Sequence, residues 1–198
     1  GWNFINHQGE LLWDKDEWFD DVEDFHEGFA WVYKKSLGCN FINKQGELLW
    51  KEDIWFDKAG DFQNGFAWVN LEGRGCNFIN INGELLWKED IWFDEVNSFQ
   101  NGFAPVKIEG KGWNFINEQG ELLWEGDIWF DRVYNFQNGF AWVQIEDKEY
   151  KLNTNGVLWD EYGNRVNIEL QESKSGLIRL TESDIHNLVI KTLKEYLY

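Results

Sequence analysis

A repeat of 37 residues organises most of this chain. The string Asn-Phe-Ile-Asn begins at Asn3 and returns every 37 residues, and Gly-Glu-Leu-Leu-Trp, Trp-Phe-Asp and Gly-Phe-Ala follow it in the same order each time. The array covers 1–159, as four copies at 1–37, 38–74, 75–111 and 112–148 and a partial fifth start at 149–159. A fixed period of this length is typical of repeat architectures, in which each unit buries its apolar face against its neighbours.

Each copy predicts three short antiparallel strands. Phe-Ala-x-Val leads through a Gly-rich turn into Asn-Phe-Ile-Asn, and a second Gly-containing turn leads into Glu-Leu-Leu-Trp, which is a hairpin pattern at both turns. One such sheet cannot bury both of its faces, so neighbouring sheets must stack. We therefore expect an all-β array of stacked three-stranded units, an open curved β-solenoid. A closed propeller-like ring is the alternative, because propeller blades have a similar length.

Residues 160–198 follow a different pattern. Alternating segments at 165–170 and 177–180 predict a β-hairpin. Thr181-Glu182-Ser183-Asp184 is typical of a helix N-terminus, and apolar residues recur at helical spacing after it. We expect this helix to cap the last apolar face of the array, and docking into a partner's groove is the other interpretation.

The composition excludes several function classes. The chain has 198 residues with 36 acidic and 18 basic side chains, a net charge of -18, which argues against binding nucleic acid through phosphate attraction. The excess lies in the copies, since residues 1–148 hold 28 acidic and 12 basic residues and the last fifty hold 8 and 6. No apolar stretch is long enough to span a membrane, and no signal peptide is visible, so we expect a cytoplasmic protein.

Residues that carry catalytic or metal chemistry are sparse. The three His are far apart and lack zinc-ligand spacing, so no metal and no cofactor is expected. Cys39 and Cys76 occupy equivalent positions and are interpreted as reduced apolar fillers. Paired-acid hydrolysis needs two carboxylates in unlike environments, whereas near-identical copies supply near-identical acids. We therefore expect a protein that is not an enzyme.

The first candidate binding site is the pentapeptide Asp-x-Trp-Phe-Asp in the connector between sheets. If this segment is extended, its Phe faces the core and its Trp and two Asp share the other face. The expected ladder consists of Trp18, Trp55, Trp92 and Trp129 with Asp16, Asp20, Asp53, Asp57, Asp90, Asp94, Asp127 and Asp131. Structural packing of each Trp, capture of a cationic or polyhydroxy ligand, and calcium binding are the three interpretations.

The second candidate surface is the position after Gly-Phe-Ala, which holds Trp31, Trp68 and Trp142 but Pro105 in the third copy. Proline in a strand marks an edge or a break in pairing, so this face is not expected to be tightly packed core. Its indoles, together with Trp2 and Trp113, are expected to be partly exposed, where aromatic side chains often anchor partners. Packing at the rim between strands is the alternative.

The recurring pattern Trp-Asn-Phe-Ile-Asn, Gly, Phe-Asp-x-Val, Phe-x-x-Gly-Phe-Ala-x-Val resembles the bacterial WG (KWG) repeat over about three quarters of the chain. The Trp-Gly dipeptide that gives the family its name is replaced here. Its positions hold Trp2-Asn3 and Trp113-Asn114 in two copies, and Cys39-Asn40 and Cys76-Asn77 in the other two. Asn tolerates the left-handed region best among non-Gly residues, so a positive backbone angle is expected to persist there. The resemblance implies a β-rich bacterial scaffold without a shared catalytic activity.

These features together predict a non-enzymatic protein-interaction scaffold. Its acidic, Trp-rich surface is expected to bind a protein with a basic surface, and an inhibitor or immunity protein is a sharper version of that hypothesis. A glycan-binding module that uses the Trp ladder is one alternative. A structural adaptor domain of a longer protein is the other.

Overall fold

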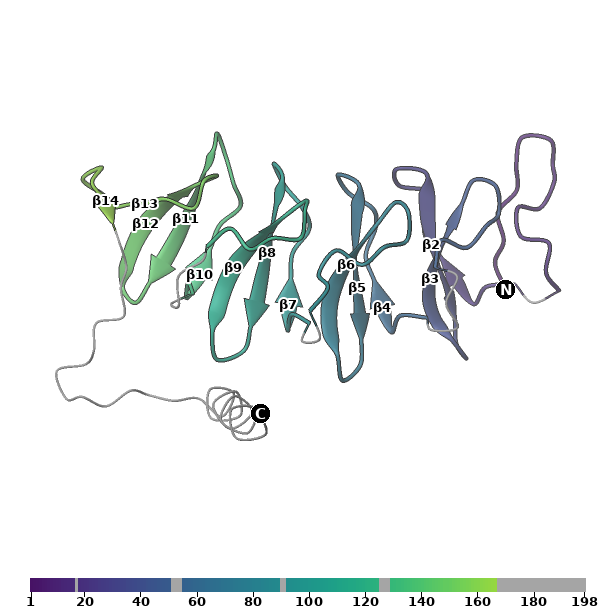
Figure 1. Cartoon of the computed structure of the whole chain (residues 1–198). Coiled ribbons are helices and arrows are strands. Elements are labelled where there is room, and N and C mark those ends of the chain that lie inside the picture. Colours follow the sequence, from purple (N-terminus) through teal and green to yellow (C-terminus); the bar gives the residue numbers. More distant parts are fainter. Residues whose placement is uncertain (17, 51–54, 90–91, 125–128, 167–198) are drawn as a thin grey trace, which may run out of the picture.

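The computed structural model describes residues 1–16, 18–50, 55–89, 92–124 and 129–166. Within these ranges the chain is all-β, and four antiparallel sheets follow one another in sequence order as a row (Figure 1). The first and last sheets lie at opposite ends of the row, so the array is open and the ring alternative does not hold. None of the residues so described belongs to a helix able to cross a membrane.

The first three sheets have the same construction, and the fourth is larger. In each of the first three sheets, a two-residue strand lies beside a six-residue strand, which in turn pairs with a second six-residue strand. They are β1 (Asp21–Val22), β2 (Phe29–Lys34) and β3 (Gly38–Asn43); β4 (Lys58–Ala59), β5 (Phe66–Leu71) and β6 (Gly75–Asn80); and β7 (Glu95–Val96), β8 (Phe103–Ile108) and β9 (Gly112–Asn117). The fourth sheet contains β10 (Arg132–Val133), β11 (Phe140–Ile145), β12 (Lys148–Asn153), β13 (Leu158–Trp159) and β14 (Arg165–Val166).

The identity of the third strand differs from the prediction. In the first three sheets the third strand comes from the connector, as β1 pairs with β2 through Asp21 and Tyr33. The Glu-Leu-Leu-Trp segment touches β3 through a single bridge between Ile42 and Leu48. Only in the fourth sheet does its counterpart form a strand, β13, as expected.

A buried asparagine explains why Glu-Leu-Leu-Trp is not a strand in the interior copies. The Asn40 side chain donates to the Trp50 carbonyl at 2.9 Å and accepts from the Trp50 and Phe41 backbone N–H groups. These bonds replace a backbone ladder. The same clamp recurs at Asn77 and Asn114.

The predicted positive backbone angle at these asparagines is wrong. Asn40, Asn77 and Asn114 lie inside β3, β6 and β9 and are extended, because their side chains are needed for the clamp. The left-handed asparagines are instead at the turn before Gly-Phe-Ala, at Asn64, Asn101 and Asn138.

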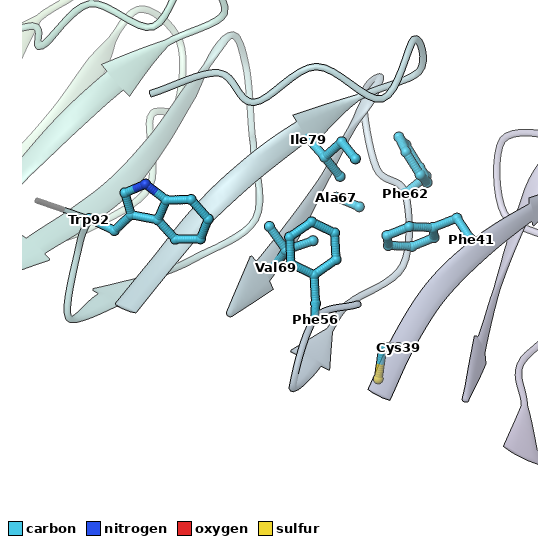
Figure 2. Packing of buried hydrophobic residues seen from close by; sticks show 8 residues of the cluster. All are labelled: Cys39, Phe41, Phe56, Phe62, Ala67, Val69, Ile79 and Trp92. Atoms are coloured by element: carbon cyan, nitrogen blue, oxygen red, sulfur yellow. The ribbon is translucent and has the colours of Figure 1, made fainter. Parts of the chain in front are cut away.

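The core lies between sheets, where one connector Phe fills each junction. Phe62 packs between two rings of the preceding sheet, with centroid distances of 4.8 Å to Phe29 and 5.0 Å to Phe41. Figure 2 shows this first junction, with Phe56 and Val69 of the following copy against Phe41. The predicted core position of the Trp-Phe-Asp phenylalanines is confirmed, since Phe19, Phe56, Phe93 and Phe130 are completely buried.

A two-bond bridge joins each sheet to the next connector. The Cys39 N–H donates to the Phe56 carbonyl at 2.6 Å, and the Phe56 N–H donates to the Cys39 carbonyl at 2.9 Å. Gly38 makes this approach possible, because a Cβ at that position would lie 2.3 Å from the Phe56 carbonyl oxygen. Gly75 and Gly112 repeat this arrangement at the next two bridges.

The predicted C-terminal elements fall mostly outside the described residues. Arg165–Val166 is a strand, as expected, but it pairs with β13. The rest of the predicted hairpin and the helix at 181–198 lie beyond residue 166, so no helical cap is part of the described array.

Candidate functional site

The four connector indoles do not share one environment. Trp18 is 45% exposed, Trp55 is half-buried, and Trp92 and Trp129 are buried at 3% and 8% exposure. In the ladder predicted from sequence, the first indole is therefore exposed to solvent, whereas the third and fourth indoles are buried.

Two basic side chains of the protein itself cover the buried indoles of Trp92 and Trp129. The Arg74 guanidinium lies 4.6 Å from the Trp92 ring centroid, and the Lys111 ammonium lies 5.7 Å from that of Trp129. Both come from the hairpin turn of the preceding sheet, where the corresponding residue before Trp55 is Leu37. Cation–π attraction, expected for a ligand, is thus used internally at these two positions.

The second carboxylate of each pentapeptide has a structural contact. Asp57 accepts a hydrogen bond from the Glu72 backbone N–H at 2.6 Å, which caps the turn between β5 and β6. The same bond, of 2.5 to 2.7 Å, is formed by Asp20, Asp94 and Asp131. These carboxylates hold the hairpins, so each has one oxygen engaged by its own chain.

Among the described residues, the first Asp of the pentapeptide lies near an indole in the first copy. Asp16 lines a cavity of about 460 Å³ with Trp18, Asp20 and Lys34. Asp53, Asp90 and Asp127 lie outside the described residues. In the described parts of the chain, no group of three or more His, Cys, Asp or Glu is placed to hold a metal ion.

The second predicted surface is partly exposed. Trp31, Trp68 and Trp113 are half-buried, whereas Trp2 and Trp142 are 59% and 43% exposed. Trp31, Trp68, Trp113 and Trp142 belong to four different sheets.

Pro105 is buried and lies in the middle strand β8, opposite Phe115 of β9. On its other side, the Asn97 N–H donates to the Pro105 carbonyl at 2.9 Å just past the last β7 pair, so the proline lies neither at an edge nor at a break in pairing, and the predicted loose packing of this position is wrong.

The described structure reveals a site that sequence reasoning did not assemble, at the outer side of the fourth sheet. We call it the end face, and it comprises Asn138, Phe140, Trp142, Lys151, Asp160 and Glu161. Adjoining cavities of about 550 and 400 Å³ are lined by these residues, and one of about 810 Å³ extends from Trp142 to Asp147 and Glu149. The sequence signal was available, since Lys151 stands opposite Trp142 where the other copies place a phenylalanine.

The charges at the end face are mixed. The Lys151 ammonium lies 4.9 Å from the Trp142 ring centroid. Backbone and side-chain hydrogen bonds from Asn164 lower the pKa of Asp160, so this carboxylate stays ionised at a lower pH than an ordinary aspartate. The end face therefore offers exposed aromatic rings beside fixed negative charge.

The row of repeated antiparallel sheets defines a β-repeat protein. The family model described as "WG containing repeat" matches residues 19–37, 56–74, 93–111 and 130–148. The chain therefore contains four WG repeats. No curated protein matches it.

Solved structures resemble the chain only in part. The computationally designed Ika8 protein is 17% identical with a TM-score of 0.43, over 80% of this chain and 54% of that one. The designed Ika4 protein is 11% identical with a TM-score of 0.41, over 80% and 96%. BamB from Moraxella catarrhalis is 11% identical with a TM-score of 0.37, over 81% and 56%. The chain thus spans about half the length of Ika8.

Proposed function

We propose that this chain is a non-enzymatic protein-interaction scaffold that binds a basic protein partner through an acidic, aromatic surface. The observation that carries the proposal is the exposed acidic stretch beside the open Trp18. Asp21, Glu23 and Asp24 are exposed and pair with no cation among the described residues. Their charge is therefore available to a partner.

Long-range attraction gives this stretch its function. The first copy holds nine acidic and three basic residues, whereas the second holds six and four. A field of one sign raises the encounter rate with an oppositely charged protein, and salt screens it over about 8–10 Å. The first copy therefore steers a basic partner.

Short-range contact supplies residence time. Trp18 lies in a cavity with Asp16, Asp20 and Lys34, and its indole and two carboxylates suit a lysine or arginine side chain in the manner of Arg74 on Trp92. Aromatic side chains that become buried on contact dominate dissociation rates. Charge thus controls association, and the indole controls dissociation.

The test is capture from the source cells with low- and high-salt washes, followed by surface-plasmon kinetics on the protein captured. Replacing Asp21, Glu23 and Asp24 by their amides is expected to slow association several-fold at low salt. The control replaces three exposed carboxylates elsewhere, Glu72, Glu89 and Glu118, by glutamine and is expected to slow it less.

Two outcomes contradict the proposal. Association that ignores both salt and the first-copy charges removes the electrostatic scaffold. Salt-resistant retention of polysaccharide, lost on Trp18→Ala, replaces it with the glycan-binding function.

A further inference from the structure

The second and third interior junctions each seat one phenylalanine of the following copy in the same way. The Phe99 ring centroid lies 4.5 Å from that of Phe66 and 4.9 Å from that of Phe78. The Phe99 carbonyl oxygen also accepts a hydrogen bond from the Asn64 side-chain amide at 2.8 Å. At the next junction Phe136 is held by Phe103, Phe115 and Asn101. The fold therefore contains a repeated two-point seat, made of a stacking ring and an amide donor, for one aromatic residue.

The end face retains both parts of this seat. Phe140 is the counterpart of Phe66, and it is 46% exposed. Asn138 is the counterpart of Asn64, and its backbone has the same left-handed conformation, with φ of 51° against 53°. Across the described ranges no ring stacks on Phe140 and no group accepts from the Asn138 amide. Both residues line the cavity of about 550 Å³.

Another copy of the repeat does not fit this seat. Lys148 stands opposite Ile145 where the interior hairpins place a glycine, and a Cβ at Gly38 would already collide with the bridging carbonyl. Lys151 replaces the second stacking phenylalanine. The bridge and half of the stacking surface for a further sheet are thus absent, while the anchor for a single aromatic residue remains. The occupant is therefore a narrow segment and not a second sheet.

Charge beside the seat selects the neighbours of that aromatic residue. The rim of the adjoining cavities carries four carboxylates, Asp147, Glu149, Asp160 and Glu161, against two ammonium groups, Lys148 and Lys151. The difference is two negative charges. A segment with lysine or arginine next to its aromatic residue complements this rim.

We propose that the end face binds an aromatic side chain carried by a basic segment of another protein, with the ring on Phe140 and the backbone carbonyl of that residue on the Asn138 amide. The site rests on the proposed function in one respect, the basic character of the partner.

The probe is the synthetic peptide acetyl-Lys-Asn-Phe-Gln-Lys-amide, which copies the interior occupant with basic ends, titrated into the full ¹⁵N-labelled chain. We expect shifts at the Asn138 side-chain amide and the Trp142 indole N–H. Phe140→Ala and Asn138→Gly are each expected to weaken binding roughly threefold to tenfold, the value of one aromatic pair or one hydrogen bond. Glycine keeps the left-handed backbone at position 138, so it removes the amide alone. Leu37→Ala, at an exposed apolar residue of the first copy, is the control and is expected to leave the affinity unchanged.

Two peptide controls separate this site from the proposed function. A peptide with alanine in place of phenylalanine that binds equally well, or binding that ignores Phe140→Ala, overturns the aromatic seat even if lysine and salt dependence persist. Binding that needs Phe140 but not the lysines overturns the basic partner.

A third control addresses the chain itself. If the peptide causes no shift, while Tyr196→Ala or Tyr198→Ala shifts the Asn138 and Trp142 signals, the chain's own C-terminal segment holds the seat and the foreign occupant is overturned.

Discussion

The interior junctions and the end face are both formed by a hairpin of two six-residue strands, but they carry different side chains on the outward face of that hairpin. At the interior junctions the residue opposite Trp31, Trp68 or Pro105 is a phenylalanine that is at most 1% exposed. At the end face the residue opposite Trp142 is Lys151, which is exposed and lies over the indole. The six-residue strands pair in the same register in both places, but the hairpin of the fourth sheet is one residue shorter and has Lys148 where the interior hairpins have glycine. The difference therefore lies in the outward side chains and in the hairpin, while the paired six-residue strands are shared.

The two regions also fasten their last segment by different means. In the interior the Asn77 side chain clamps Trp87, whereas in the fourth sheet Tyr150 occupies the asparagine position and β13 pairs by its backbone. A side-chain clamp leaves the segment free to bend toward the next sheet. A backbone ladder completes the sheet instead, which suits a terminal unit.

Exchange of the distinguishing residues gives the largest expected effect. Phe78→Lys places a charge in a junction that is closed to water, and we expect the free energy of unfolding to fall by at least about 3–5 kcal/mol. The reverse change, Lys151→Phe, is expected to leave stability nearly unchanged but to increase self-association, because it enlarges an exposed apolar patch. Urea unfolding followed by Trp fluorescence and light scattering measure the two effects. Tolerance of Phe78→Lys would show that the interior junctions are not sealed.

Removal of the clamp should cost less. Asn77→Ala leaves the Trp87 N–H and carbonyl and the Phe78 N–H without their side-chain partner, so we expect a loss of about 2–4 kcal/mol. Tyr150→Ala in the fourth sheet is the matched change and should cost less, because β13 keeps its backbone bonds. Urea denaturation of both variants tests this, and equal losses would contradict the distinction.

A smaller loss is expected where a candidate ligand carboxylate holds a turn. Asp94→Ala removes the acceptor for the Glu109 N–H, and we expect a loss of about 1.5–3 kcal/mol, since the bond involves a charged group. Asp94→Asn keeps an acceptor oxygen and should lose less. Thermal unfolding of both variants decides between a structural and a purely ligand-binding carboxylate. No loss in either variant would favour ligand binding.

The smallest perturbation is a chemical label at two interior junctions. Cys39 is buried, and this burial raises the pKa of its thiol, so less thiolate is present near pH 8 than for an ordinary cysteine. Cys76 is only half-buried. We expect iodoacetamide to modify Cys76 first, as followed by mass spectrometry over time. Equal rates would mean that the first junction opens as readily as the second.

The repeat made most of the fold predictable. The 37-residue period, the buried phenylalanines of Trp-Phe-Asp and the hairpin from Phe-Ala-x-Val to Asn-Phe-Ile-Asn follow from alternation and glycine placement. The third strand was not predictable in the same way, because Asn40 competes with the backbone ladder through its side chain. A pattern of strand-forming residues does not reveal such competition.

The candidate site was less predictable than the fold. The sequence places the same Trp in every connector, but Arg74 over Trp92 and Leu37 before Trp55 differ by one hairpin residue that lies 18 positions away. The end face depends on Lys151. This lysine occupies the position of the interior phenylalanine because the hairpin before it is one residue shorter than the interior hairpins. Both features become visible only when strand register is known.

The glycine at the bridge has an evolutionary consequence. Because Gly38, Gly75 and Gly112 each admit the carbonyl of the following copy, duplication of a 37-residue unit inside the array creates a junction that already has its bridge. A copy inserted after the fourth sheet would lack this bridge, because Lys148 stands where the interior hairpins have glycine. Duplication from within can therefore lengthen the array, whereas the hairpin at Lys148 leaves no room for the same bridge.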